Sequence, residues 1–102
     1  MYKLKYSVAA EYDLHDTIEY IAQESIKNAK EYLKGYEKKV ELLQLNPYMG
    51  VECKSKDIQY DCRVLVYQRH IIIYQVLEEA EELFIIRIYR SSEDYIYKFS
   101  SQ

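Results

Sequence analysis

The chain has 102 residues, enough for one domain with its own hydrophobic core and too few for two. Hydrophobic residues make up 49% of it and charged residues 30%, a balance that excludes a disordered chain. The formal net charge of −3 argues against general electrostatic attraction to nucleic acid, while leaving room for a local basic patch. We therefore expect a single domain over residues 1–102.

The number of cysteines and the lengths of the apolar runs indicate in which compartment of the cell the protein is located. Cys53 and Cys62 are too few for a disulfide framework, and we expect them to be free thiols. No apolar run reaches the roughly 18 residues of a membrane-spanning helix, and the N-terminal residues lack the apolar core of a signal peptide. The sequence thus predicts a cytoplasmic protein that does not enter a membrane.

The first half of the chain predicts a short strand followed by two helices. Residues 2–6 alternate as a strand does, and Ser7 is a suitable N-cap for the helix that follows. That helix has apolar residues at helical spacing, with acids at positions we expect to face solvent (Asp13, Asp16 and Glu19). A second apolar stripe predicts a helix over residues 25–45, formed by Ala29, Leu33, Tyr36, Val40 and Leu43. Asn46-Pro47 ends this helix, and Gly50 predicts a turn.

The hydrophobic pattern changes period after Pro47. Three runs rich in β-branched and aromatic residues predict strands at residues 62–67, 70–77 and 83–89. The second and third runs are apolar on both faces, as expected of strands in mid-sheet beneath a covering layer. We therefore predict an α+β fold of two layers, β-α-α-β-β-β, in which an N-terminal helical hairpin packs on a small antiparallel sheet.

Five segments in order resemble the RelE/ParE superfamily, the toxins of type II toxin–antitoxin systems. They are "YKLKYSVAAEYDLHDTIEYIAQES", "NAKEYLKGYEKKVELLQLNPYMG", "CRVLVY", "HIIIYQV" and "IIRIYRSSEDY". The resemblance implies a cognate antitoxin as partner, and either a homodimer or a hetero-oligomer with that antitoxin. It also implies one of two activities on the same fold. ParE-like members inhibit DNA gyrase by binding it, whereas RelE-like members cut mRNA on the ribosome without a metal.

The RNase interpretation needs cations to stabilise the developing phosphorane charge and groups that transfer protons. The resemblance offers Arg63, Arg87, Arg90 and Tyr95 for these roles. Ile71, however, occupies the position at which RelE-like enzymes carry an arginine, and the adjacent His70 is expected to face the other side of its strand. An RNA site would therefore lack about half of its cations.

The ParE-like interpretation needs exposed contact residues and no proton-transfer pair. Lys54 and Lys56 lie near Arg63 in the sequence and predict a small basic patch. Arg90, Tyr95 and Tyr97 lie at or beyond the end of the last strand, where partner contacts are expected. Glu93 and Asp94 lie between them and would repel an RNA phosphate. We therefore favour a ParE-like gyrase inhibitor over a RelE-like RNase, with a member that only binds antitoxin as a third interpretation.

Neither a cofactor nor a metal ion is expected. The chain supplies the atom types that bind zinc, but without a recognised spacing, in Cys53, Cys62, His15 and His70. We expect His15 to face solvent on the first helix and His70 to begin a strand. No glycine-flanked serine is present that would form a nucleophile turn.

Overall fold

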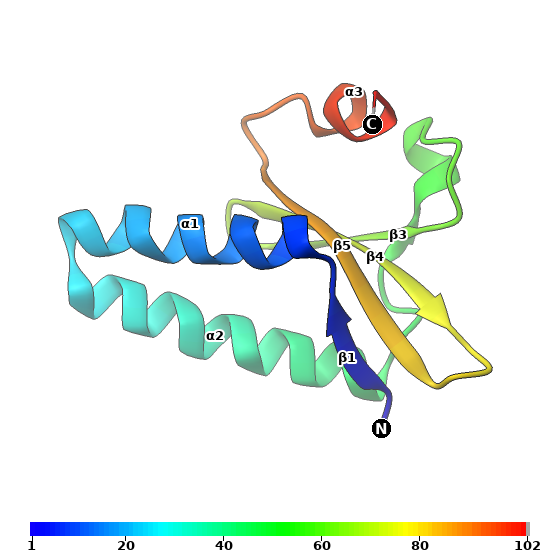
Figure 1. Cartoon of the computed structure of the whole chain (residues 1–102), viewed down its shortest axis with the longest axis horizontal. Coiled ribbons are helices and arrows are strands. Elements are labelled where there is room, and N and C mark those ends of the chain that lie inside the picture. The colour runs from blue at the N-terminus through cyan, green and yellow to red at the C-terminus, as the bar shows by residue number, and fades with distance from the viewer. Residues whose placement is uncertain (102) are drawn as a thin grey trace.

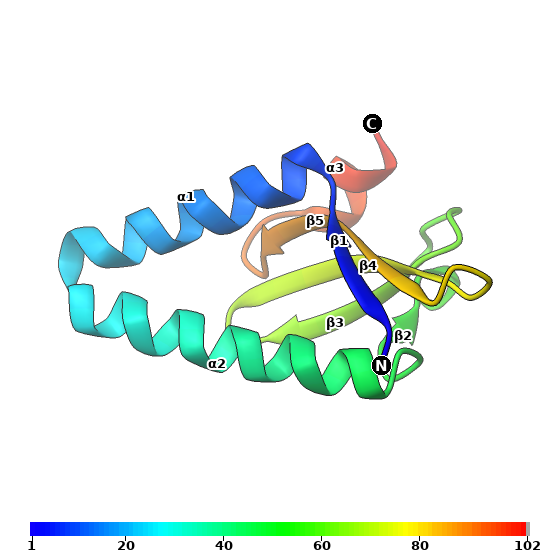
Figure 2. The ribbon, with the colours of Figure 1, turned by 60° about the horizontal axis from the view of Figure 1, so that its bottom comes forward.

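The computed structural model describes residues 1–101 of the chain. Its elements are β1 (Lys3–Tyr6), α1 (Val8–Glu24), α2 (Ile26–Leu45), β2 (Val51–Glu52), the 3-10 helix η1 (Cys53–Lys56), β3 (Arg63–Tyr67), β4 (His70–Leu77), β5 (Glu82–Arg90) and α3 (Tyr95–Ser100). Figures 1 and 2 show α1 and α2 lying side by side as a hairpin against one face of the sheet, with α3 on the other side. The predicted α+β layout is confirmed, and β2, η1 and α3 are additions to it.

Serine hydroxyls begin both long helices. Ser7 is the N-cap of α1, and its Oγ accepts a hydrogen bond of 2.9 Å from the Ala10 N–H. Ser25 ends α1 and begins α2, and its Oγ accepts from the Asn28 N–H. A single extended residue therefore reverses the chain between the two helices. Its hydroxyl also satisfies one of the free N–H groups in the first turn of α2.

The sheet has the order β1-β5-β4-β3-β2 and is mixed. Strands β2 to β5 pair antiparallel, as predicted, but β1 pairs parallel to β5 through Leu4 and Leu83. The prediction of a purely antiparallel sheet was wrong in this one pairing. The helical hairpin and strands β2 to β4 lie between β1 and β5 in the chain, so no tight turn forces these two strands to run in opposite directions.

Tyrosine hydroxyls connect the helical hairpin to the sheet. Tyr67 of β3 donates to the Tyr32 carbonyl of α2 at 2.9 Å, and Tyr74 of β4 donates to the Pro47 carbonyl at 2.8 Å. Each hydroxyl lies against one of the two glycines: a Cβ on Gly35 would be 2.3 Å from the Tyr67 hydroxyl, and one on Gly50 would be 2.6 Å from the Tyr74 hydroxyl. Neither glycine has a positive φ, so close approach and not turn conformation requires them.

The second face of the sheet carries its own apolar cluster, and it includes both cysteines. Cys53 and Cys62 form a disulfide with their Cα atoms 5.3 Å apart, which corrects the expectation of free thiols. The pair closes the loop after β2, where the Cys53 N–H also donates to the Cys62 carbonyl. The low cysteine count excluded a framework but not a single bridge across one loop. Ile58 of this loop and Phe99 of α3 are buried in the same cluster.

A β-bulge in β5 determines where α1 contacts the sheet edge. The register with β4 shifts between Ile73 and Tyr74, which leaves Ile86 of β5 without an opposing residue. Two groups of Ser7 bond to β5 at this point: its N–H donates to the Ile85 carbonyl, and its hydroxyl donates to the Ile86 carbonyl at 2.6 Å. The start of α1 is thus fixed to the strand that carries Arg87 and Arg90.

Candidate functional site

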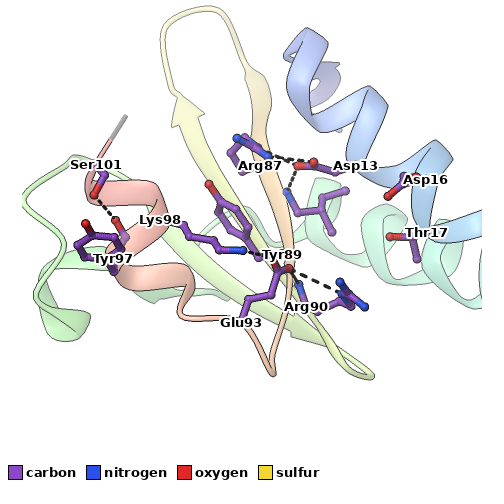
Figure 3. Close-up of a pocket in the computed structure, with 11 residues that line it drawn as sticks. Asp13, Asp16, Thr17, Arg87, Tyr89, Arg90, Glu93, Tyr97, Lys98 and Ser101 are labelled. Carbon is purple, nitrogen blue, oxygen red and sulfur yellow. Dashed lines mark hydrogen bonds and ion pairs between the residues drawn. The ribbon is translucent and has the colours of Figure 1, made fainter. Parts of the chain in front are cut away.

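Polar side chains of α1, of β5 after the bulge and of the C-terminal segment surround a cavity of about 480 Å³, which we call the β5 pocket (Figure 3). Residues of α1, β5 and the C-terminal segment line it, including Asp13, Asp16, Arg87, Tyr89, Arg90, Glu93, Tyr97 and Lys98. Three of the residues predicted from the sequence, Arg87, Arg90 and Tyr97, therefore lie together. Next to them are acids that we expected to face solvent, Asp13 and Asp16, or to lie between contact residues, Glu93.

Arg87 is held by a two-pronged pair with Asp13 of α1. Its Nε lies 2.9 Å from Asp13 Oδ2 and its Nη2 3.1 Å from Oδ1, and the Ile88 N–H donates to Oδ2 at 2.8 Å (Figure 3). This hydrogen bonding raises the pKa of Arg87. The Arg87 guanidinium also lies over the Tyr89 ring at 4.8 Å from its centroid. The expectation that Asp13 faces solvent was wrong, because its carboxylate anchors α1 to β5.

Glu93 organises the other cations of the pocket. Lys98 Nζ lies 2.6 Å from its Oε1, the Arg90 N–H donates to its Oε2 at 2.8 Å, and the Arg90 Nε is 3.9 Å from Oε2. Partial burial raises the pKa of Glu93, but the bonds from Lys98 and Arg90 outweigh it and lower the pKa on balance. Arg87 and Lys98 therefore have close carboxylate partners, whereas the only ion pair of the exposed Arg90 guanidinium within residues 1–101 is the long contact with Glu93.

The structure separates the remaining predicted site residues. Arg63 pairs with Tyr74 of β4, and Arg90 pairs with His70 of the same strand. These two positions lie four residues apart along β4, so the arginines are roughly 15 Å apart along the strand direction. Tyr95 packs against the apolar cluster of the second face and does not line the β5 pocket.

Arg63 is bound to the loop after α2. Its Nη1 donates to the Gly50 carbonyl at 2.8 Å and the Tyr48 carbonyl at 3.2 Å, and its Nη2 lies 3.4 Å from a Glu52 oxygen. Lys54 lines a cavity of about 90 Å³ together with Arg63, whereas Lys56 does not. The predicted basic patch thus reduces to an exposed lysine beside an arginine that already has partners.

The sequence analysis missed or misplaced three residues of the candidate site, Asp13, Glu93 and Lys98. A charged strand residue needs a partner when a helix covers it, and this requirement, had it been applied to Arg87, would have pointed to an acid near the start of α1. Glu93 and Lys98 are five residues apart, and only the turn before α3 brings them together.

His70 and Ile71 face opposite sides of β4, as the alternation predicted. Ile71 is 5% exposed and belongs to the second-face cluster, at the position where the resemblance places an arginine. His70 is 9% exposed and shares a 2.9 Å hydrogen bond between its Nδ1 and the hydroxyl of Tyr32 on α2. Burial lowers the pKa of His70 and Arg90 lowers it further, against the opposing effect of Glu93.

Protein stability should fall as the pH drops below 6.5. An unfolded chain binds a proton at His70 near pH 6.5, whereas the folded chain, with its lowered pKa, does not. The free energy of unfolding should therefore decrease between pH 7 and 5.5 in urea denaturation. His70→Asn keeps an acceptor for Tyr32 and removes the titration, so its stability should change less over this range. Equal losses in both proteins would contradict the assignment.

Solved structures place this fold in a known class. The chain matches a chain of the crystal structure of the intact E. coli RelBE toxin–antitoxin complex at 18% identity and a TM-score of 0.57, over 91% of this chain and 100% of that one. It matches the isolated E. coli RelE toxin at 17% identity and a TM-score of 0.57, over 99% and 96% of the two chains. At these identities the likeness establishes the RelE-like fold alone.

The family follows from the sequence model that matches residues 4–95, described as the ParE toxin of the type II toxin–antitoxin system parDE. The chain belongs to this family of toxins. A comparison with curated proteins gives no significant match. None of the helices in residues 1–101 has the length and apolar character needed to cross a bilayer.

Proposed function

We propose that this protein is a ParE-like toxin that inhibits DNA gyrase by binding it, and that a cognate antitoxin neutralises it. The observation that carries the proposal is the close pairing of Arg87 and Lys98 with carboxylates in the β5 pocket, which among residues 1–101 leaves Arg90 as its one loosely paired cation. Transition-state stabilisation of phosphoryl chemistry needs cations free to meet developing negative charge. A recognition surface has no such need.

The second face of the sheet supports the same proposal. Its centre is apolar, with Val64, Ile71 and Ile73 each at most 5% exposed, and the η1 loop and α3 pack over it. A cation-lined RNA site on this face would require polar side chains at these positions. The net charge of −3 likewise disfavours close contact with ribosomal RNA.

The antitoxin half of the proposal draws on the structural relatives. One solved relative is a RelE mutant in complex with a peptide of the antitoxin RelB, and another is the intact RelBE complex. The present chain exposes apolar side chains beside its β2–β3 edge, where Val51 is 50% exposed and Val66 55%. Strand addition with burial of such side chains is a recurring mode of peptide recognition.

A supercoiling assay with purified gyrase tests the target. Increasing toxin should inhibit supercoiling of relaxed plasmid and trap cleaved complexes. Tyr97 is 69% exposed at the β5 pocket, so Tyr97→Ala should weaken inhibition by about tenfold without unfolding the protein. The exposed Lys38 on α2 lies away from this pocket, and Lys38→Gln should inhibit like the natural chain.

The alternatives give different outcomes in parallel assays. Absence of any effect on gyrase at excess toxin would refute the proposal. Cleavage of mRNA on translating ribosomes, lost in Arg90→Ala and Tyr95→Phe, would establish the RNase interpretation instead. Binding of the antitoxin with neither activity would establish a member that retains only that interaction.

A further inference from the structure

A second cavity, of about 750 Å³, lies where the distal half of the helical hairpin meets the end of the sheet. We call it the hairpin cleft and define it by Tyr20 of α1, Tyr32 of α2, Arg69 and His70 at the β3–β4 turn, and Arg90 and Ser92 after β5. Figure 2 shows this turn and the end of β5 facing the hairpin. Its volume falls within the roughly 300–1,000 Å³ typical of small-molecule sites.

One side of the cleft presents a hydrogen-bonding nitrogen that the protein leaves unused. The Tyr32 hydroxyl and His70 Nδ1 share a hydrogen bond of 2.9 Å. This bond occupies one ring nitrogen, and the tautomer decides whether the other, Nε2, donates or accepts. Nε2 has no hydrogen-bond partner within residues 1–101, although His70 is nine-tenths buried. No side-chain nitrogen of this region is sealed without a partner, so Nε2 is open to the cleft that the ring lines.

The rim of the cleft supplies two guanidinium groups that have few bonds to acidic side chains of the protein. The exposed Arg69 side chain forms neither a hydrogen bond nor an ion pair with any residue in 1–101. Arg90 is 60% exposed and its ion pair with Glu93 is long, at 3.9 Å. Asp16 is the single acid of the lining. Guanidinium groups bind phosphate through paired N–H donors, and the Ser92 hydroxyl adds a further donor.

The opposite wall offers an aromatic surface. Tyr20 is 61% exposed, and the Arg90 guanidinium lies 6.0 Å from its ring centroid. Tyr20 therefore presents a ring near the cations, with Ile21 beside it in the lining. Planar bases stack on such rings with a gain of about 1–3 kcal/mol per base.

We propose that the hairpin cleft binds a mononucleotide, with its base against Tyr20, its phosphate at Arg69 and Arg90, and a polar atom hydrogen-bonded to His70 Nε2. The combination of a ring surface with neighbouring cations distinguishes this ligand class from inorganic anions and from neutral aromatics. The site goes beyond the proposed gyrase and antitoxin interactions and does not depend on them.

Isothermal titration of the full chain with adenosine 5′-monophosphate tests the site. Binding should be at least tenfold tighter for this probe than for adenosine or inorganic phosphate alone, since each carries half of the recognised groups. Ligand addition should also shift the NMR signals of the His70 ring and of the Ser92 amide. Arg69→Gln should weaken binding about tenfold, the loss expected for one charge-assisted contact.

Matched variants separate the cleft from the rest of the surface. Tyr20→Ala should weaken binding several-fold, whereas Tyr12→Ala on the same helix should not, because Tyr12 is 74% exposed outside the cleft. Lys38→Gln controls for the loss of one positive charge. A single-stranded oligonucleotide with a 5′-phosphate forms a second arm: binding equal to the mononucleotide identifies a strand end as the source, and weaker binding identifies free nucleotide.

Three results would overturn the proposal. The first is no heat and no His70 signal change with millimolar probe. The second is equal affinity for inorganic phosphate and the nucleotide, which would remove the role of Tyr20. The third is equal weakening by Tyr12→Ala and Tyr20→Ala, which would place the ligand elsewhere.

Discussion

Gly50→Ala is expected to lower the free energy of unfolding by about 2–3 kcal/mol, the upper part of the roughly 1–3 kcal/mol typical of adding a methyl group to a closely packed site. The new Cβ would lie 2.6 Å from the Tyr74 hydroxyl oxygen, 2.8 Å from a ring carbon and 2.9 Å from the Val64 carbonyl oxygen. Tyr74 is fully buried, and its hydroxyl accepts from the Gly50 N–H while it donates to Pro47. Neither the ring nor the strand backbone has room to move. Urea denaturation measures the loss.

Gly35→Ala is the matched control, since the three atoms nearest to its Cβ all belong to the Tyr67 side chain, with the hydroxyl at 2.3 Å and a ring carbon at 3.3 Å. Adding Tyr67→Phe removes the closest atom and should restore much of the stability. Tyr74→Phe should not rescue Gly50→Ala, because the Val64 carbonyl stays in place. A Gly50→Ala protein that unfolds at the urea concentration of the natural chain would contradict this account of the glycines.

Asp13→Ala is expected to cost about 3 kcal/mol of stability, as removal of one partner from a partly buried ion pair does. The substitution leaves the Arg87 guanidinium, 23% exposed, without its carboxylate. It also leaves the Ile88 N–H without its acceptor at the edge of β5. Chemical denaturation should show the loss, and the NMR signal of the Ile88 amide should move.

Two substitutions on the same helix test that assignment. Asp13→Asn keeps an acceptor for Ile88 but removes the charge, so its stability should lie between those of the natural chain and Asp13→Ala. Asp16→Ala removes an exposed carboxylate that has no ion-pair partner within residues 1–101, and its effect should stay within about 0.5 kcal/mol. Similar losses for Asp13→Ala and Asp16→Ala would show that the Arg87 pair contributes nothing specific.

Long periodic segments made most of the fold predictable. The stripe of α2 places Tyr36, Val40 and Leu43 in the core as expected, and Ser7 caps α1 as expected. The segments β2, η1 and α3 span two to six residues each, too short for a periodic pattern to develop. The disulfide was missed because it depends on how the loop after β2 folds back.

Strand register limited what could be predicted of the site. Arg63 and Arg90 looked equally available in the sequence, but the pairing of β3, β4 and β5 places them at opposite ends of the sheet. The bulge at Ile86 shifts the register of β5, and no sequence pattern marks a bulge at that position. The cluster of Arg87, Arg90 and Tyr97 was predictable because these residues are close along the chain.

Strand β3 and the end of β5 that extends beyond β1 differ in how much of their backbone is open to another strand. Beyond its pairing with β1, strand β5 has its backbone occupied by side chains of Ser7, Asp13 and Glu93. On the other side, β2 pairs with only Arg63 and Val64, so the rest of β3 has no neighbouring strand beyond it within residues 1–101. Open strand backbone can pair with a strand of another chain. A strand that adds beside β3 would meet free backbone groups, whereas one that approaches the end of β5 would first have to displace three side chains.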